Sequence, residues 1–134
     1  MCGITGYSLT RFSIENKHFS SDENLEKLLY ESNELIKHRG PDDSGTFFDH
    51  INGIGFGHRR LSIIDTSSLG NQPMTDAKEK IEVIFNGEIY NYRELKRGLQ
   101  KKGISFKSNS DTEVIVYLYI EYGPEMLKKL NGIF

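Results

Sequence analysis

A cysteine stands directly after the first methionine of the chain, at Cys2. A lone cysteine in a protein usually serves as a small, buried apolar side chain. Position 2 adds a second interpretation, because removal of Met1 ahead of a small residue would leave Cys2 with a free α-amine beside its own thiol. Such an amine has a pKa of about 7.7–8.0 and such a thiol one of about 8.5, so one residue would hold both a nucleophile and a general base.

The dipeptide Asn86-Gly87 opens the polar run NGEIYN. Asn-Gly is a strong hairpin signal, so the first interpretation is a tight turn between two strands. The second is an oxyanion hole, in which the side-chain NH₂ of Asn86 and the backbone N–H of Gly87 donate to one developing negative oxygen. Both interpretations stay open when the dipeptide is considered alone.

Two charged residues also have a structural and a chemical interpretation. Arg39 is either a surface arginine beside a turn or a guanidinium that binds a carboxylate through two parallel hydrogen bonds. Asp111 is either a carboxylate that favours the start of a helix or an acceptor for a substrate ammonium group.

Composition limits the classes of function that these residues can serve. The chain has 134 residues and a formal net charge of −2, which fits one domain and lacks the basic surface typical of nucleic-acid or anionic-membrane binding. It has no apolar run long enough to span a bilayer and no signal-peptide pattern, so we expect a cytoplasmic protein. One cysteine excludes an internal disulfide framework. The histidines show no ligand spacing, which argues against a zinc site; they are His18, His38, His50 and His58.

Hydrophobic periodicity and turn residues predict a mixed fold. We expect strands at 2–9, 46–50, 54–58, 61–65 and 81–85, and helices at 22–38, 92–102, 111–122 and 124–130. Ser21 or Asp22 would cap the first helix, and Ser110 with Glu113 forms a capping-box pattern. Loops are expected at 39–45 and 66–80, and Asn52-Gly53 as a hairpin turn. This mixture predicts an α+β fold with antiparallel sheet and helices packed on it. A further strand begins near Gly132 just before the chain stops, which we interpret as a truncation.

Several motifs occur together along the whole chain, in a fixed order. They are MCGI at 1–4, RGPD at 39–42, LSIID at 61–65, QPM at 72–74, NGEIYN at 86–91, SDTE at 110–113 and LNGIF at 130–134. This series resembles the N-terminal glutaminase domain of glutamine-hydrolysing asparagine synthetases, which are class II glutamine amidotransferases. The resemblance implies an N-terminal-nucleophile hydrolase with a four-layer α-β-β-α sandwich, incomplete at its C-terminus.

The resemblance also implies roles for individual residues. Cys2 would be the nucleophile, with Asn86 and Gly87 as the oxyanion hole. Arg39 would hold the α-carboxylate of glutamine, and Asp111, with the region of Glu88, its α-amine. The implied substrate-binding residues are Arg39, Gly40, Pro41, Asp42, Asp43, Asn86, Gly87, Glu88 and Asp111.

The implied reaction releases glutamate and ammonia from L-glutamine through a γ-glutamyl thioester. No cofactor or metal is implied for this domain. Its implied partner is an ATP- and Mg²⁺-dependent synthetase domain of the same parent chain, absent here, which amidates aspartate; a homodimer is a further option. Two alternatives stay open: a synthetase-like paralogue that amidates another acceptor, and a non-catalytic regulatory module or inert fragment of the same fold.

Overall fold

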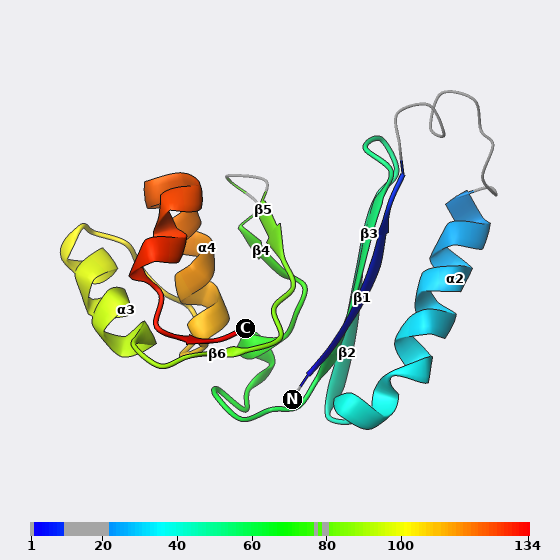
Figure 1. Cartoon of the computed structure of the whole chain (residues 1–134), viewed down its shortest axis with the longest axis horizontal. Helices are drawn as coiled ribbons and strands as arrows, with labels where there is room; N and C mark the ends of the chain where they lie inside the picture. The colour runs from blue at the N-terminus through cyan, green and yellow to red at the C-terminus, as the bar shows by residue number, and fades with distance from the viewer. Residues whose placement is uncertain (1, 10–21, 77, 79–80) are drawn as a thin grey trace.

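The computed structural model describes residues 2–9, 22–76, 78 and 81–134. Helices, 3₁₀ turns and short strands alternate along it (Figure 1). In chain order they are β1 (Gly3–Ser8), α2 (Asp22–Leu35), η1 (Lys37–Arg39), β2 (Asp43–Asp49), β3 (Ile54–Arg60), η2 (Ser68–Gly70), β4 (Met74–Asp76), β5 (Ile81–Val83), β6 (Glu88–Ile89), α3 (Tyr92–Lys101), α4 (Asp111–Tyr122), η3 (Gly123–Lys129) and β7 (Gly132–Ile133). The predicted α+β class is confirmed, and every described strand pair is antiparallel.

The largest sheet has three strands in the order β1-β3-β2. The β2–β3 hairpin pairs Asp49 with Ile54, so four residues form its loop. Within that loop the Asp49 carboxylate accepts the backbone N–H of Asn52 at 3.0 Å, which is a local stabilisation typical of Asx turns. The turn predicted at Asn52-Gly53 is therefore confirmed.

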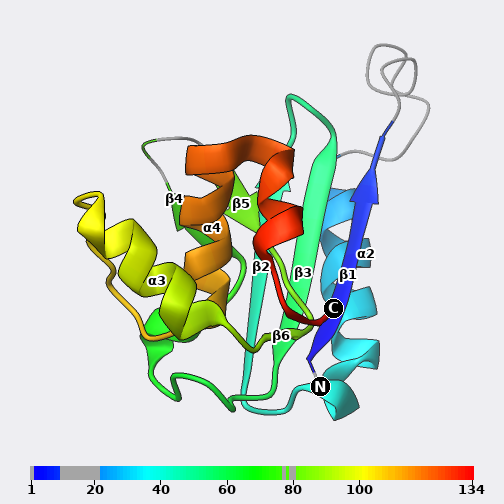
Figure 2. The ribbon, with the colours of Figure 1, turned by 60° about the vertical axis from the view of Figure 1, so that its left-hand side comes forward.

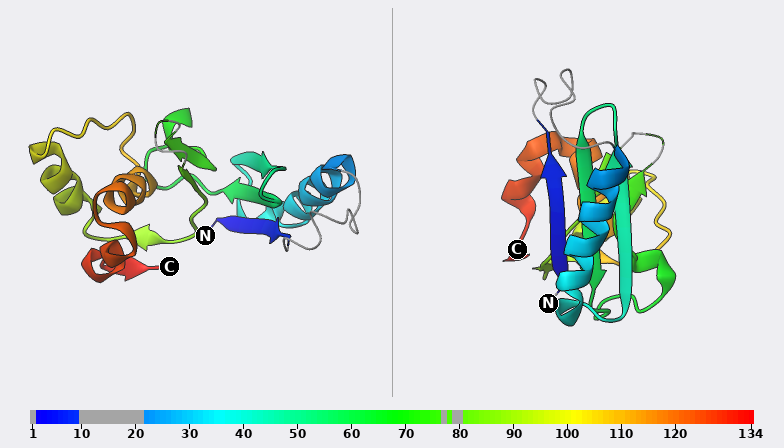
Figure 3. Two further views of the ribbon diagram at one scale, coloured as in Figure 1. Left: turned by 90° about the horizontal axis from the view of Figure 1, so that it is seen from above. Right: turned by 90° about the vertical axis from the view of Figure 1, so that its right-hand side faces the viewer.

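Helix α2 covers one face of this sheet (Figure 3). Its buried Leu25 and Leu29 supply the apolar stripe of an amphipathic helix. Arg59 of β3 faces α2, because its Nη1 donates to Glu34 Oε1 at 2.8 Å. The predicted helix at 22–38 is three residues too long, since the α-helix ends at Leu35 and a 3₁₀ turn follows; the proposed Ser21 cap lies outside the described residues.

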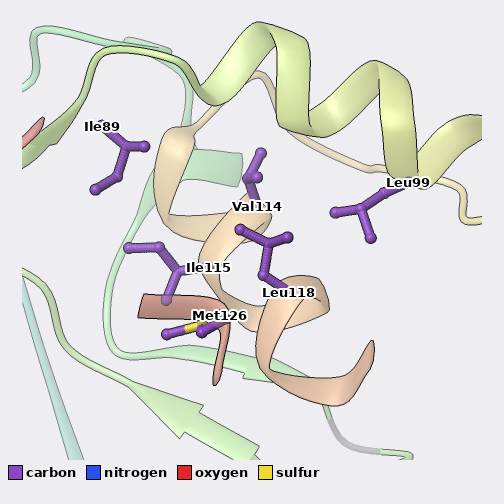
Figure 4. Packing of buried hydrophobic residues seen from close by; sticks show 6 residues of the cluster. All are labelled: Ile89, Leu99, Val114, Ile115, Leu118 and Met126. Atoms are coloured by element: carbon purple, nitrogen blue, oxygen red, sulfur yellow. The ribbon is translucent and has the colours of Figure 1, made fainter. Parts of the chain in front are cut away.

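The opposite side of the molecule holds the β4–β5 pair and the two C-terminal helices (Figures 1 and 2). Helix α4 contacts β4, β5, α3 and η3. Because it is enclosed by these elements, α4 is apolar over most of its length rather than amphipathic. The core around it consists of Ile89, Leu99, Val114, Ile115, Leu118 and Met126 (Figure 4).

The C-terminal helices agree closely with the sequence prediction. The expected helices at 92–102 and 111–122 form, and the short helix expected at 124–130 is the 3₁₀ segment η3. Ser110 caps α4 by accepting the N–H of Thr112 at 3.1 Å. Glu113 does not complete the expected capping box, because its carboxylate accepts the N–H groups of Lys107 and Ser108 instead.

Three local predictions are wrong. No strand forms at 61–65, where the backbone groups find side-chain partners: Leu61 N–H donates to Cys2 Sγ and Ser62 N–H to Asp42 Oδ2. The loop predicted at 39–45 ends early, because β2 already begins at Asp43. The loop predicted at 66–80 contains η2 and β4. Within the described part of the chain, no helix is long and apolar enough to cross a membrane.

Candidate functional site

The start of β1, the segment before β6 and strand β7 lie close to one another (Figure 2). Residues of all three segments line a cavity of about 220 Å³. Its walls come from segments that are distant in the sequence. They are Cys2, Arg60, Leu61, Ile63, Ile64, Gly70, Gln72, Phe85, Asn86, Gly87, Glu88, Tyr90, Ser110, Asp111, Thr112 and Ile133. Of the residues that the sequence singled out, Cys2, Asn86, Gly87, Glu88 and Asp111 line it.

The half-buried Cys2 is fixed in this wall by contacts to its thiol and its backbone. Its Sγ accepts the N–H of Leu61 at 3.4 Å, and its carbonyl accepts Nε of Arg39 at 3.1 Å. The Sγ atom also faces the Leu61 carbonyl oxygen at 3.7 Å, so one residue contacts the thiol through both of its backbone polar groups. Met1 lies outside the described residues.

Asn86 and Gly87 connect β5 to β6, which pair with different strands. The dipeptide is therefore not the turn of a hairpin, and that interpretation is wrong. The Oδ1 atom of Asn86 is buried without a hydrogen-bond partner among the described residues. A Cβ at position 87 would lie 2.3 Å from the Ile133 carbonyl oxygen, so only glycine fits this close approach.

Arg60, at the end of β3, is the cation that lines the cavity, and the sequence analysis did not identify it. Its side chain is 5% exposed, and its Nη1 donates to the Ser67 carbonyl at 2.8 Å and to Asn71 Oδ1 at 2.6 Å. Its Nη2 donates to the carbonyls of Ile64 and Asp65. No carboxylate in the described ranges forms an ion pair with the Arg60 guanidinium. The available signal was strand alternation, which places His58 and Arg60 on the face opposite Arg59.

The segment 39–43 does not line the cavity. It lies behind the wall instead: the Gly40 carbonyl accepts Nε of Arg59 at 3.2 Å, and the N–H of Asp42 donates to the Arg60 carbonyl at 3.1 Å. The structure thus places Arg39, Gly40, Pro41, Asp42 and Asp43 outside the cavity walls, with Arg39 exposed and bonded to the Cys2 backbone.

Two carboxylates complete the polar lining. Asp111 is 5% exposed, and its Oδ2 accepts the N–H of Ile89 at 3.0 Å. Burial raises the pKa of Asp111, while that N–H and the N–H of Thr112 act in the opposite direction. Glu88 adds a carboxylate to the same wall. A cavity with one cation, two carboxylates and a thiol can bind the two charged α-groups of an amino acid while the thiol faces its side chain.

His58 lies next to this cavity, in the middle of the sheet. It is 0% exposed, and its Nε2 lies 3.3 Å from the Phe85 carbonyl, so this nitrogen carries the proton. Burial lowers its pKa from 6.5 to about 4, and the positive charge of Arg60 acts in the same direction; the Phe85 carbonyl and Asp43 oppose them. His58 is therefore neutral near pH 7.

This neutral histidine predicts acid sensitivity of folding. Between pH 6.5 and 4 the unfolded chain binds a proton at His58 and the folded chain does not, so stability falls as the pH falls. We expect His58 to lower the free energy of unfolding by about 2 kcal/mol from pH 7 to pH 5. Urea denaturation at both pH values, on the wild type and on His58→Gln, measures this difference. An equal pH dependence in the two proteins would contradict it.

Among the described residues, no group of three or more His, Cys, Asp or Glu side chains is placed so that it could bind a metal ion.

The sequence is similar to those of known proteins along its whole length. The family described as "Glutamine amidotransferase domain" matches residues 1–134. Asparagine synthetase [glutamine-hydrolyzing] 1 of Bacillus subtilis is 44% identical over 135 residues, covering 100% of this chain and 20% of that protein. Asparagine synthetase [glutamine-hydrolyzing] of Sandersonia aurantiaca is 45% identical over 106 residues, covering 79% of this chain and 19% of that protein. Amidase chry2 of Gibberella zeae is 38% identical over 135 residues, covering 100% of this chain and 20% of that protein.

The chain thus spans about 20% of the length of these curated relatives. The resemblance that the motifs predicted is confirmed, since the family match extends over every motif from residue 1 to residue 134. This chain belongs to the family of glutamine amidotransferase domains, and among its relatives are the glutamine-hydrolysing asparagine synthetases.

Proposed function

We propose that this chain hydrolyses L-glutamine to glutamate and ammonia, with Cys2 as the nucleophile. One observation carries the proposal: a single cavity brings the Cys2 thiol to the Asn86-Gly87 dipeptide and to charged groups of both signs. The family match adds independent support, because the family is that of glutamine amidotransferase domains.

In this proposal Arg60 binds the α-carboxylate of glutamine, and Asp111 and Glu88 bind its α-ammonium group. Arg60 takes the role first expected for Arg39, because it lines the cavity and no carboxylate among the described residues forms an ion pair with it. Arg39 instead positions the nucleophile, since its Nε donates to the Cys2 carbonyl.

The proposed reaction begins when the thiol proton passes to the α-amine that removal of Met1 exposes on Cys2. The thiolate then attacks the side-chain amide carbon of glutamine and forms a C–S bond, while Asn86 and Gly87 donate to the oxyanion. The amine returns the proton to the leaving nitrogen as the C–N bond breaks, which releases ammonia. Water then attacks the γ-glutamyl thioester, the amine takes up the water proton, and glutamate leaves as the thiol re-forms.

We further propose the four-layer α-β-β-α sandwich for this domain. The order of elements in space supports it, since α2, the β1-β3-β2 sheet, the β4–β5 pair and helices α4 and α3 follow one another across the molecule (Figure 1).

For the whole protein, we propose that residues 1–134 form the glutaminase domain and that a separate synthetase domain uses ATP, Mg²⁺ and the released ammonia to make asparagine from aspartate. The names of the Bacillus subtilis and Sandersonia aurantiaca relatives support this assignment. The similarity to Amidase chry2, a relative with a different name, favours a second candidate in which the ammonia goes to another acceptor.

Ammonia and glutamate release from L-glutamine tests the hydrolysis directly. We expect the two products in equal amounts, no release from L-asparagine, and complete loss after alkylation of Cys2, the single cysteine. Activity that survives full alkylation, verified by mass spectrometry, would refute the thiol mechanism. A processed and folded chain that releases no ammonia would favour a non-catalytic module.

The two arginines predict different kinetic effects. Arg60→Lys should raise KM for glutamine by about 10- to 100-fold, because a charge-assisted hydrogen bond contributes about 1.5–3 kcal/mol and a lysine ammonium cannot take the position in which the surrounding oxygen atoms hold the guanidinium. Arg39→Lys, which also keeps the charge, should change KM by less than about threefold. Steady-state kinetics of both variants measures the two changes in KM. A larger increase in KM for Arg39→Lys than for Arg60→Lys would show that Arg39 binds the α-carboxylate of glutamine.

A further inference from the structure

The backbone around Phe85 has no strand partner. Strand β5 ends at Val83 and β6 begins at Glu88, so the residues between them lie outside the ladders of the described sheets. Yet both backbone polar groups of Phe85 are bonded. Its N–H donates to Gln72 Oε1 at 2.6 Å, and its carbonyl faces Nε2 of His58 at 3.3 Å.

The two side chains that hold Phe85 are themselves fixed. His58 is 0% exposed and stands on the central strand β3, opposite Ile4 on one side and Gly45 on the other. Gln72 is 8% exposed, and its Nε2 donates to Thr112 Oγ1 at 3.1 Å, in the first turn of α4. One side chain therefore connects Phe85 to the large sheet, and the other connects it to the helix that carries Asp111.

Gly45 allows these two anchors to come close together. Residues opposite each other in an antiparallel pair lie on the same face, so Gly45 and His58 face the same way. A Cβ at position 45 would lie 2.2 Å from the Gln72 carbonyl oxygen, closer than two such atoms approach in proteins. The segment that carries Gln72 thus rests directly on the backbone of β2.

Phe85 directly precedes Asn86 and Gly87, so these contacts act on the peptide group next to the proposed oxyanion hole. The Phe85 carbonyl shares a rigid peptide plane with the backbone nitrogen of Asn86. Fixing that plane limits the directions in which Asn86 and Gly87 can present their donors. His58 does not line the cavity, and its side-chain hydrogen bond reaches the cavity wall through the carbonyl of Phe85, which does line it.

We propose that His58 and Gln72 form a clamp on the peptide groups of Phe85, and that this clamp positions the oxyanion hole of Asn86 and Gly87. His58 and Gln72 are positioning residues, and the inference rests on the proposed glutaminase function. A hole held in place before the reaction needs no reorganisation when the charge develops, which is the basis of its catalytic effect.

The kinetic test compares kcat and KM of variants in which one buried polar side chain is replaced. His58→Leu and Gln72→Leu each remove one arm of the clamp. His58→Gln keeps an N–H donor that can reach the Phe85 carbonyl. Asn33→Ala is the control, because Asn33 is equally buried, donates to the His58 carbonyl from the α2 side and does not contact Phe85.

We expect both leucine variants to lower kcat for glutamine by about 10- to 100-fold, since a small misplacement of catalytic groups costs up to about 100-fold. KM should change by less than about threefold, because glutamine binding does not depend on the oxyanion hole. His58→Gln should recover most of the lost kcat, and Asn33→Ala should keep wild-type kcat. Wild-type kcat in folded His58→Leu and Gln72→Leu would overturn the clamp, as would an equal loss in Asn33→Ala.

NMR spectroscopy tests the clamp without relying on the proposed glutaminase activity. Amide ¹H–¹⁵N spectra without glutamine should show the Asn86 and Gly87 signals shifted or broadened in His58→Leu, and unchanged in Asn33→Ala. Long-range ¹H–¹⁵N spectra of the wild type should show His58 with its proton on Nε2. If the wild type releases no ammonia, the proposed function fails, while these signals still decide the clamp. Unmoved Asn86 and Gly87 signals in His58→Leu, or a His58 proton on Nδ1, would overturn it.

Discussion

A chain that keeps Met1 is expected to release no ammonia from glutamine, although every side chain of the cavity is present. With Met1 attached, the nitrogen of Cys2 is an amide, which has no basicity near neutral pH. It can neither take the thiol proton nor protonate the leaving nitrogen. His58 cannot replace the amine, because it has a pKa of about 4 and lies outside the cavity walls, and in the proposed function Asp111 and Glu88 bind the substrate ammonium group.

Intact-mass spectrometry of the assayed sample, paired with ammonia release, tests this expectation. A preparation with a protease site placed directly before Cys2 provides the matched control, because cleavage creates the free α-amine in the same protein. Turnover should appear only after cleavage. Normal turnover by a chain shown to retain Met1 would remove the amine from the mechanism.

Asn86→Ala is expected to lower kcat for glutamine by about 100- to 1,000-fold, the usual effect of losing one oxyanion-hole donor. KM should change much less, since the donor acts mainly on the tetrahedral intermediate and less on bound glutamine. The variant also removes the Asn86 Oδ1 atom, which is buried and unpaired among the described residues, so its loss should not destabilise the fold.

Steady-state kinetics and thermal unfolding of Asn86→Ala measure both effects. Asn109→Ala is the matched control, because Asn109 is exposed and does not line the cavity. The rate of Cys2 alkylation should stay at the wild-type value in Asn86→Ala, which would show that the nucleophile is intact. If kcat and KM of Asn86→Ala both equal those of the wild type, Asn86 is not an oxyanion donor.

Prediction from the sequence was most accurate for elements whose structure depends on local residue spacing and capping residues. The helices at 92–102 and 111–122 follow from their spacing and flanking residues, because their apolar positions pack within one compact core. Cys2, Asn86 and Asp111 were identified as a set, and all three line one cavity.

Prediction failed where tertiary partners override local preference. The β-branched composition of 61–65 favours a strand, but its N–H groups donate to Cys2 and Asp42, and Arg60 binds the carbonyls of Ile64 and Asp65. These partners are distant in sequence or belong to a side chain, and periodicity contains no information about either.

Arg39 and Arg60 also show that the sequence alone does not reveal which side chain lines the cavity. Arg39 belongs to a conspicuous motif, RGPD, and Arg60 to none that the sequence analysis recognised. Which of them faces a cavity depends on the direction of β3 and on what lies over it. Strand alternation separates Arg59 from Arg60, but only the packing of α2 on one face decides which of the two is turned away from the helix.

The cavity joins residues from nearly the whole length of the chain, since Cys2 and Ile133 both line it. A ribosome delivers the nucleophile first and the last wall more than a hundred residues later. A nascent chain therefore carries its thiol through synthesis beside an unfinished pocket. For the proposed hydrolysis, this order of synthesis alone postpones ammonia release until the chain has reached the wall that encloses the thiol.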